Sequence, residues 1–282
     1  MNRIYTRCMG TLAVTASLSV TGNVLADDSA GQALVPLPSI FDFTHGDGFG
    51  GALGVGVEYE GAYDGADETE LEVMPAGAVQ YRKGNHLFFW EGYELGWRGR
   101  LADHWLVQAG IRDEEGLDPD DSDDGNLDGI EPRDSHVVGF LEVRRGLDAD
   151  WRNWVGARLM GGASDFGVLG VLAAGHRFGD HVDGTGTEVY AYLTFGDNDF
   201  INKDFGVTAD DALTSGLPQT TLDGGYRAAG VQLVHRRYLT RNIHAIAQAG
   251  IERYSGEIGD SPIAREDYEF EVSLALVWHF GR

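Results

Sequence analysis

The segment from Tyr268 to Phe280, just before the C-terminal Gly281 and Arg282, constrains the fold of this chain most strongly. Its residues alternate in polarity. One face carries Phe270, Val272, Leu274, Leu276, Trp278 and Phe280, and the other carries Glu269, Glu271, Ser273, Ala275 and His279, with Val277 as the exception. This period of two indicates a β-strand with one apolar and one polar face. Such a strand fits either a soluble sheet packed on a core or a membrane barrel, in which the apolar face meets lipid and the polar face meets a wet lumen.

The same alternation recurs between breaks rich in Gly, Asp and Asn, which is the pattern of a β-meander. The runs are Phe49–Tyr59, Leu71–Arg82, Leu87–Trp97, Trp105–Arg112, Val137–Arg145, Trp151–Met160, Val168–Phe178, Thr187–Phe195, Tyr226–Tyr238, Ile243–Tyr254 and the closing segment. Bacterial single-chain barrels have an even number of strands, so these eleven runs predict a barrel of about twelve. The missing strand lies either within Leu37–Thr44 or at a break in Leu87–Arg98, where Glu91 would otherwise face lipid among Leu87, Phe89 and Leu95.

The N-terminal residues have the pattern of a secretory signal peptide, predicted for residues 1–26. Arg3 and Arg7 precede a mildly apolar core, and Val24-Leu25-Ala26 forms a cleavage site before Asp27. Residues 27–47 are predicted to be an irregular periplasmic segment, and residues 48–282 the barrel. Cys8 is the only cysteine, so a processed chain would contain no disulfide.

A net charge of −24 excludes a nucleic-acid partner, because nucleic acid requires a basic face. The long links 113–133, 197–224 and 255–267 alternate with short ones such as residues 100–104, 146–150 and 239–242. Outer-membrane barrels keep short turns in the periplasm and long loops outside, which predicts long acidic extracellular loops. The six tryptophans lie near the ends of the predicted strands, where interfacial aromatic belts form.

Charges of both signs fall on the polar faces of the predicted strands. The residues concerned are Glu58, Arg112, Glu142, Arg144, Arg152, Arg158, His176, Glu188, Arg236, His244 and Glu252. Their mixed sign favours a lumen plugged by salt bridges, and the alternative is a small gated pore. A barrel of about twelve strands is intermediate between filled barrels and open porins.

Three segments taken together carry a family resemblance: YRKGNHLFFWEGYELGWR (81–98), FGVTADDALTSGL (205–217) and GDSPI (259–263). They resemble the MipA/OmpV family of outer-membrane proteins, in which an aromatic-Gly-Val segment precedes a Ser-Gly-Leu step and an Asp-Ser-Pro step precedes the final strand. Asp204 stands where family members often have a tyrosine before the Phe-Gly-Val. The resemblance implies an outer-membrane barrel without catalytic residues, either a scaffold for a murein transglycosylase and a murein synthase or a porin-like protein.

The sharpest local motif is DDSDDGNLDGIE, from Asp120 to Glu131. It fits the spacing of an EF-hand calcium loop, with Asp120, Ser122, Asp124, Asp128 and Glu131 as candidate calcium ligands and Gly125 at the sharp turn. Pro132 follows directly and no flanking helices are predicted, so the alternative is a solvated acidic loop.

These observations predict an all-β, antiparallel transmembrane β-barrel of the bacterial outer membrane. We expect it to contact outer-membrane lipid and to act as an envelope scaffold, with a small-solute pore as the alternative. A soluble periplasmic β-sandwich is the third reading. No enzyme is expected, because GxSxG and HExxH are absent and no spacing singles out Asp197, Asp199, Asp204, Asp210, Asp211 or His45.

Overall fold

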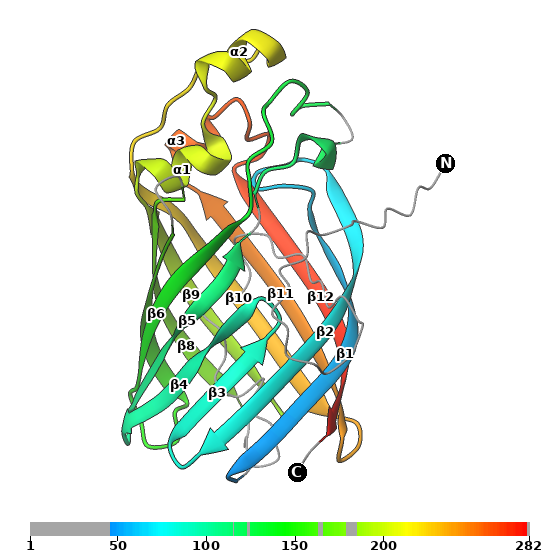
Figure 1. Cartoon of the computed structure of the whole chain (residues 1–282), viewed down its shortest axis with the longest axis vertical. Coiled ribbons are helices and arrows are strands. Elements are labelled where there is room, and N and C mark those ends of the chain that lie inside the picture. Colours follow the sequence, from blue (N-terminus) through cyan, green and yellow to red (C-terminus); the bar gives the residue numbers. More distant parts are fainter. Residues whose placement is uncertain (1–45, 115, 123–124, 163–165, 179–184, 281–282) are drawn as a thin grey trace, which may run out of the picture.

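The computed structural model describes residues 46–114, 116–122, 125–162, 166–178 and 185–280, and in them the chain forms a closed barrel (Figure 1). The strands are β1 (Gly48–Gly61), β2 (Thr69–Lys83), β3 (His86–Glu91), β4 (Glu94–Ala102), β5 (Trp105–Glu114), β6 (His136–Gly146), β7 (Asn153–Gly161), β8 (Val168–Phe178), β9 (Gly186–Gly196), β10 (Gly225–Tyr238), β11 (Ile243–Tyr254) and β12 (Tyr268–Phe280). The prediction of an antiparallel barrel of twelve strands is therefore confirmed.

Every strand pairs with its sequence neighbours, and the first and last strands pair with each other to close the wall. In the closing pair, Leu53 lies opposite Trp278 and Val57 lies opposite Leu274. The C-terminal segment thus closes the barrel. Closure leaves no open sheet edge along this pair, which is how a barrel satisfies its backbone groups.

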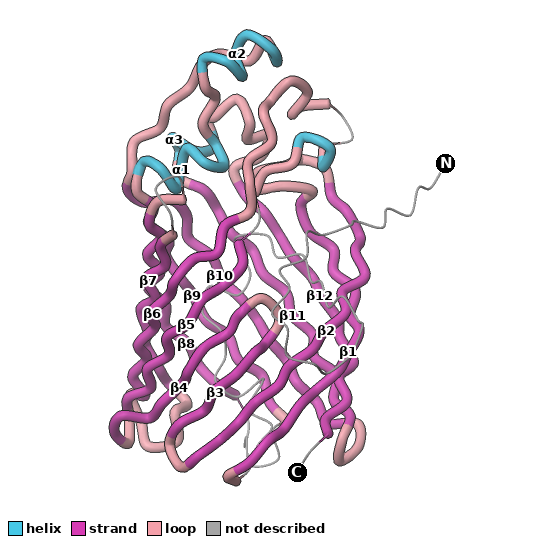
Figure 2. The backbone as a smooth tube through the Cα atoms, viewed as in Figure 1, coloured by secondary structure: helices cyan, strands magenta, loops and turns pink. Residues whose placement is uncertain are grey.

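The two ends of the barrel differ. The β2–β3, β4–β5, β6–β7 and β10–β11 turns lie at one end with the end of β12, and the long loops with the described helices lie at the other (Figures 1 and 2). The tight β3–β4 turn points toward the long-loop end. The links predicted to be long, 113–133, 197–224 and 255–267, therefore share one end. Within the described residues, no helix is long and apolar enough to span a membrane.

The outer surface of the wall is apolar on all sides. Large hydrophobic side chains on it include Leu53, Val55, Val73, Phe88, Leu141, Leu172, Leu193, Val231, Leu274, Leu276 and Trp278. Packing between two sheets would have buried these residues, so the sandwich alternative fails. Val277, the exception in the closing strand, is 4% exposed and lies on the inward face, in phase with Ser273 and His279. A Cβ on its paired residue Gly54 would lie 3.0 Å from Val277 Cγ2. The glycine of β1 makes room for this valine.

The run Leu87–Trp97 is two strands joined by a tight turn. Gly92 has a φ of 55°, a conformation that favours glycine, and Glu91 pairs directly with Glu94 across the hairpin. The break proposed at Glu91 is therefore correct, but the facing assigned to the first half is wrong. Leu87 and Phe89 are 3% and 2% exposed and face the lumen with Glu91, whereas Phe88 is 52% exposed. The turn resets the alternation, so Leu95 faces outward although Leu87 does not.

The helices all lie in the long loops: η1 (Pro119–Asp121), α1 (Asn198–Phe205), α2 (Ala209–Ser215) and α3 (Gly256–Gly259). Asp197 caps α1 by accepting a hydrogen bond from the N–H of Phe200, and Thr208 and Asp211 form a capping box on α2. The predicted signal peptide, the alternative strand within Leu37–Thr44 and most of segment 27–47 lie outside the described residues.

Candidate functional site: the lumen and the two barrel ends

The lumen of the barrel holds a network of buried ion pairs that centres on Glu94 of β4. Its carboxylate pairs with Arg112 of β5 at 3.4 Å, contacts Arg158 of β7, and accepts a hydrogen bond from Gln108 at 3.1 Å. These groups come from three strands and all lie on inward-facing positions. The alternation of each strand therefore brings residues that are far apart in sequence to one point in the barrel interior.

The network extends from this centre around the wall. Arg98 pairs with Glu91, Arg112 with Glu114, Arg158 and Arg144 with Glu142, and Arg177 with Glu188. We call these residues the luminal ion network: Glu91, Glu94, Arg98, Arg112, Glu114, Glu142, Arg144, Arg158, Arg177 and Glu188. Its five arginines and five glutamates balance in charge, as expected for charges buried away from bulk water.

Aromatic rings support the arginines of the network. The guanidinium of Arg158 lies 4.1 Å from the ring centre of Phe140, and that of Arg144 lies 4.8 Å from the ring of Trp154. The indole N–H of Trp154 donates to Glu188 at 2.6 Å. Trp154 is thus an interior tryptophan, in contrast to Trp105 and Trp278 on the outer surface. These contacts join inward side chains along the part of the wall formed by β3 to β9.

Nine of the eleven residues predicted to face the lumen are buried in the wall's interior. Arg152 is not, because it lies in the turn before β7 and is exposed. His176 faces outward, where its ring packs on Phe178 and its Nδ1 lies 2.8 Å from Asn153. Strand β8 is apolar on both faces, with Leu169 and Val171 inside, so its alternation could not reveal which face is which.

The wall formed by β1, β2, β11 and β12 is acidic. Glutamates lie directly opposite each other across these strands, in the pairs Glu58–Glu72, Glu60–Glu70 and Glu252–Glu269. Like charges at opposed positions destabilise a sheet. Between them and the short-turn end, the same wall carries small inward residues, including Ala52, Gly54, Gly56 and Ala78.

The long loops at the other end pack together around a second apolar cluster. We call it the cap cluster: Tyr63, Ala66, Leu117, Leu127, Ile130, Val207 and Ile263. Its members come from the β1–β2, β5–β6, β9–β10 and β11–β12 loops. Arg133 connects two of these loops by hydrogen bonds, because its guanidinium donates to the backbone carbonyls of Asn202 at 3.2 Å and Gly206 at 2.7 Å. The loops therefore form one packed cap above the barrel (Figure 2).

An arginine of the wall ties the cap to the barrel. Arg227 of β10 pairs with Asp64 of the β1–β2 loop at 2.6 Å and with Glu252 of β11 at 2.5 Å. Burial raises the pKa of Asp64 to about 6, against the opposing effect of the Arg227 guanidinium. Asp64 is thus a buried carboxyl that holds its proton more tightly than a solvent-exposed aspartic acid does.

The predicted calcium loop is part of this cap. Leu127 and Ile130 are buried in the cap cluster, Asn126 Nδ2 donates to Tyr63 at 2.8 Å, and the φ of Gly125 is 77° as the motif requires. Asp120, Asp128 and Glu131 are exposed and Ser122 is half-buried. Asp124 lies outside the described residues, and within the described ones no three His, Cys, Asp or Glu side chains converge on a metal position. Calcium binding stays a prediction.

Two of the acidic residues considered for catalysis have structural roles. Asp197 and Asp211 cap helices, and Asp211 also accepts from the N–H of Glu131 at 2.8 Å. In the GDSPI segment, Ser261 donates to the carbonyl of Phe205 at 2.6 Å and Ile263 joins the cap cluster. This segment is a turn that fastens the last loop to the cap. His45 lies outside the described residues.

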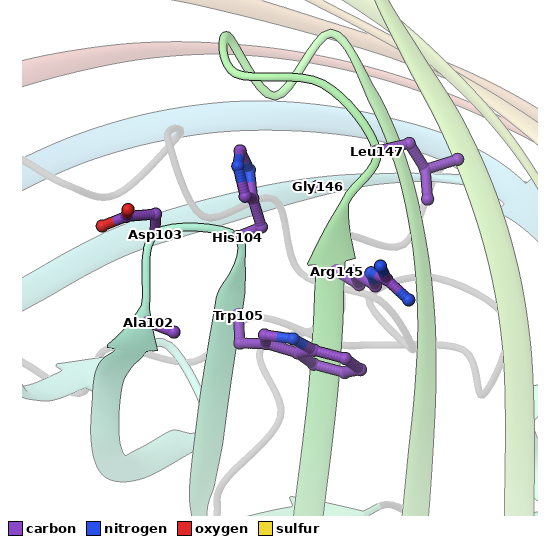
Figure 3. Close-up of a pocket in the computed structure, with 7 residues that line it drawn as sticks. All are labelled: Ala102, Asp103, His104, Trp105, Arg145, Gly146 and Leu147. Atoms are coloured by element: carbon purple, nitrogen blue, oxygen red, sulfur yellow. The ribbon is translucent and has the colours of Figure 1, made fainter.

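At the opposite end, a pocket of about 400 Å³ lies between the β4–β5 turn and the end of β6 (Figure 3). Its lining residues are Ala102, Asp103, His104, Trp105, Arg145, Gly146 and Leu147. Trp105 was expected to lie in an interfacial belt, and no motif around it predicts a pocket. The pocket arises because residues from two neighbouring hairpins meet, and no local motif encodes that pairing.

Comparison with solved structures finds other membrane barrels. The NanC porin is 11% identical, with 80% of this chain and 98% of that chain covered and a TM-score of 0.41. The toluene transporter TbuX of Ralstonia pickettii is 11% identical, with 84% and 90% covered and a TM-score of 0.41. The toluene transporter TodX of Pseudomonas putida is 9% identical, with 89% and 94% covered and a TM-score of 0.46. At these identities the likeness concerns the fold alone.

A search of curated proteins finds no match to this chain. The sequence profile of one family does match, over residues 53–280, and its description reads "MltA-interacting protein MipA". The matched region spans β1 to β12 and contains all three segments on which the resemblance rested, so the suspected family is confirmed. This outer-membrane-type β-barrel belongs to the MipA family.

Proposed function

We propose that this barrel is an interaction protein of the bacterial outer membrane that holds murein-remodelling enzymes at its periplasmic end. The family's description names an interaction with MltA, which supports a murein transglycosylase as the kind of partner. The observation that carries the proposal is the luminal ion network, whose arginines and glutamates pair with one another across β3 to β9. A barrel whose inward charges pair with one another is suited to presenting a surface.

The periplasmic face consists of the short turns, because outer-membrane barrels place short turns in the periplasm. Exposed leucines stand in or beside three of them: Leu101, Leu147 and Leu239. Large exposed apolar side chains beside polar turn residues are typical of protein contacts. A murein enzyme anchored on the inner side of the membrane would reach these turns before any other part of the barrel.

A binding measurement with purified components tests this proposal. The full-length barrel in lipid nanodiscs is immobilised, and capture of a purified murein transglycosylase is compared between the wild type and the Leu101→Ser, Leu239→Ser double variant. We expect weaker capture by the double variant. The matched control is Leu213→Ser, which changes an 84% exposed leucine in the cap at the other end and should leave capture unchanged. No capture by the wild type would overturn the proposal.

A small-solute channel is the second candidate function, and the acidic wall favours it. The opposed pairs Glu58–Glu72 and Glu60–Glu70, with small residues nearer the short turns, suit a narrow cation-selective path. Steady single-channel conductance with a cation-selective reversal potential in planar bilayers would favour the channel. Capture of the transglycosylase without conductance would favour the scaffold.

A further inference from the structure

An arginine and a tryptophan form a pair on the outer surface of the wall at the short-turn end. Trp105 begins β5 and Arg145 stands next to the end of β6, and the two residues lie directly opposite each other in the sheet. The guanidinium of Arg145 lies 5.4 Å from the centre of the Trp105 ring. Both side chains are exposed, so the pair faces the surroundings of the barrel.

The pair belongs to the pocket between the two hairpins. The N–H of Gly146 donates to the carbonyl of His104 at 2.9 Å and fixes the turn of one hairpin against the other. Trp105, Arg145 and Leu147 extend toward one side, whereas the carboxylate of Asp103 points away from them (Figure 3). The open side of the pocket therefore offers one cation, an indole and an apolar side chain that is 58% exposed.

The charge of Arg145 differs from that of the luminal arginines. Each arginine of the luminal ion network pairs with a carboxylate, whereas Arg145 has no carboxylate partner in the part of the chain that the structure describes. The nearest acid along the chain after it, Asp148, accepts hydrogen bonds from the backbone N–H groups of Arg152 and Asn153 at 2.8 Å. Asp148 is thus engaged by its own turn, and Arg145 remains available to an anion.

The surface that continues from the pocket is apolar. On the outer face of the same two strands, Val107 lies opposite Val143 and Ala109 lies opposite Leu141. An anion bound at Arg145 would therefore have hydrocarbon surface directly beside it along the wall. Tryptophan and arginine at the end of an apolar wall are the residues that stand at the level of lipid headgroups.

We propose that the Trp105–Arg145 pocket binds the phosphate of a glycerophospholipid from the periplasmic leaflet, with its acyl chains along Val107, Val143 and Leu141. A guanidinium matches the geometry of a phosphate with two parallel hydrogen bonds, and this charge-assisted contact is among the stronger ones. The apolar surface of Val107, Val143 and Leu141 favours a lipid over a free anion, because only the lipid has acyl chains that can pack against it. This inference rests on the membrane placement in the proposed function and adds a specific lipid to it.

Native mass spectrometry of the full-length protein, released from nanodiscs of defined composition, tests the site. The probes are phosphatidylglycerol, phosphatidylethanolamine, diacylglycerol and inorganic phosphate. We expect the two phospholipids to be retained and the other two not, and the Arg145→Gln and Trp105→Leu variants to bind phospholipid about tenfold more weakly. The matched control is Arg237→Gln, which removes an exposed arginine at the same end of β10 and should bind as the wild type does.

Three results on lipid and phosphate binding would overturn the inference. They are equal retention by Arg145→Gln and the wild type, equal loss in Arg237→Gln, and binding of inorganic phosphate as tight as that of phospholipid. A loss of transglycosylase capture in Arg145→Gln with unchanged lipid retention would also overturn it, because the pocket would then be a protein contact. A wild-type chain that does not insert into nanodiscs would contradict the membrane placement itself.

Discussion

Single buried carboxylates connect several strands of the barrel, and Glu94 is the centre of the luminal ion network. It contacts Arg112, Arg158 and Gln108, so its removal leaves two buried arginines short of a partner. We expect Glu94→Gln to destabilise the barrel by about 3–5 kcal/mol, the usual effect of breaking a buried ion pair. Urea unfolding in detergent micelles measures this. Glu257→Gln, at an exposed position in α3, is the control and should change the midpoint little.

We expect Asp64 to make the stability of the cap depend on pH. Its pKa is raised to about 6 in the folded protein from an ordinary value of 3.8, so the folded state binds more protons between these values. Stability therefore falls as pH rises from about 4 to about 6, and the carboxylate destabilises the cap above that range. We expect hydrogen exchange in residues 62–68 to show this pH dependence beyond the intrinsic rate change, and Asp64→Asn to abolish it. An unchanged profile in the variant would exclude Asp64 as the source.

At the scale of elements, the β3–β4 hairpin depends on its turn. Gly92 has a φ of 55° and open space around its Cα, so the cost of a side chain there lies in the backbone alone. We expect Gly92→Val to destabilise the barrel by about 1–2 kcal/mol, the cost of a left-handed conformation for an L-residue. Gly139→Val, at an outward position where the nearest atom is 3.8 Å away, is the control. Equal effects of the two variants on the unfolding midpoint would argue against this account of the turn.

The sequence predicted some strands and their facing correctly, but not all of them. Strands with one apolar and one polar face, such as β5 and β12, were predictable because their alternation is clear. β8 has apolar residues on both faces, so its inward face could not be assigned. The helix α1 was missed because its buried residues Phe200, Ile201, Asp204 and Phe205 mix a carboxylate with apolar side chains and its length is short. Its N-cap at Asp197 is the one signal that could have located it.

The loop from Asp120 to Glu131 lets the calcium hypothesis be tested directly. If the loop binds calcium, we expect calcium to raise the thermal midpoint of the wild type, since a ligand that binds only the folded state stabilises it. Glu131→Gln should remove that rise, because the motif assigns this residue the bidentate contact. Asp134→Asn, outside the motif in the same loop, should retain it. Identical calcium responses of wild type and Glu131→Gln would eliminate the site.

At the scale of the whole molecule, four regions differ in the kinds of side chain that they carry. The outer wall is apolar, the lumen is charged, the cap is closed by the cap cluster, and the short-turn end carries exposed leucines and the Trp105–Arg145 pocket. The apolar wall and the charged lumen could be inferred from alternation, because each strand encodes its own two faces. The cap and the pocket could not, because they are made where separate loops or hairpins meet and no single stretch of sequence encodes the contact.

The central claim is that the outward side chains of every strand touch lipid while the inward ones do not. Spin labels on single cysteines at positions 273 to 278 of β12 test it in proteoliposomes, because Cys8 in the predicted signal segment is the only native cysteine. We expect accessibility to oxygen to alternate, with high values at positions 274, 276 and 278 and low values at positions 273, 275 and 277. Accessibility without a period of two, or low oxygen access at Leu274 and Trp278, would contradict it.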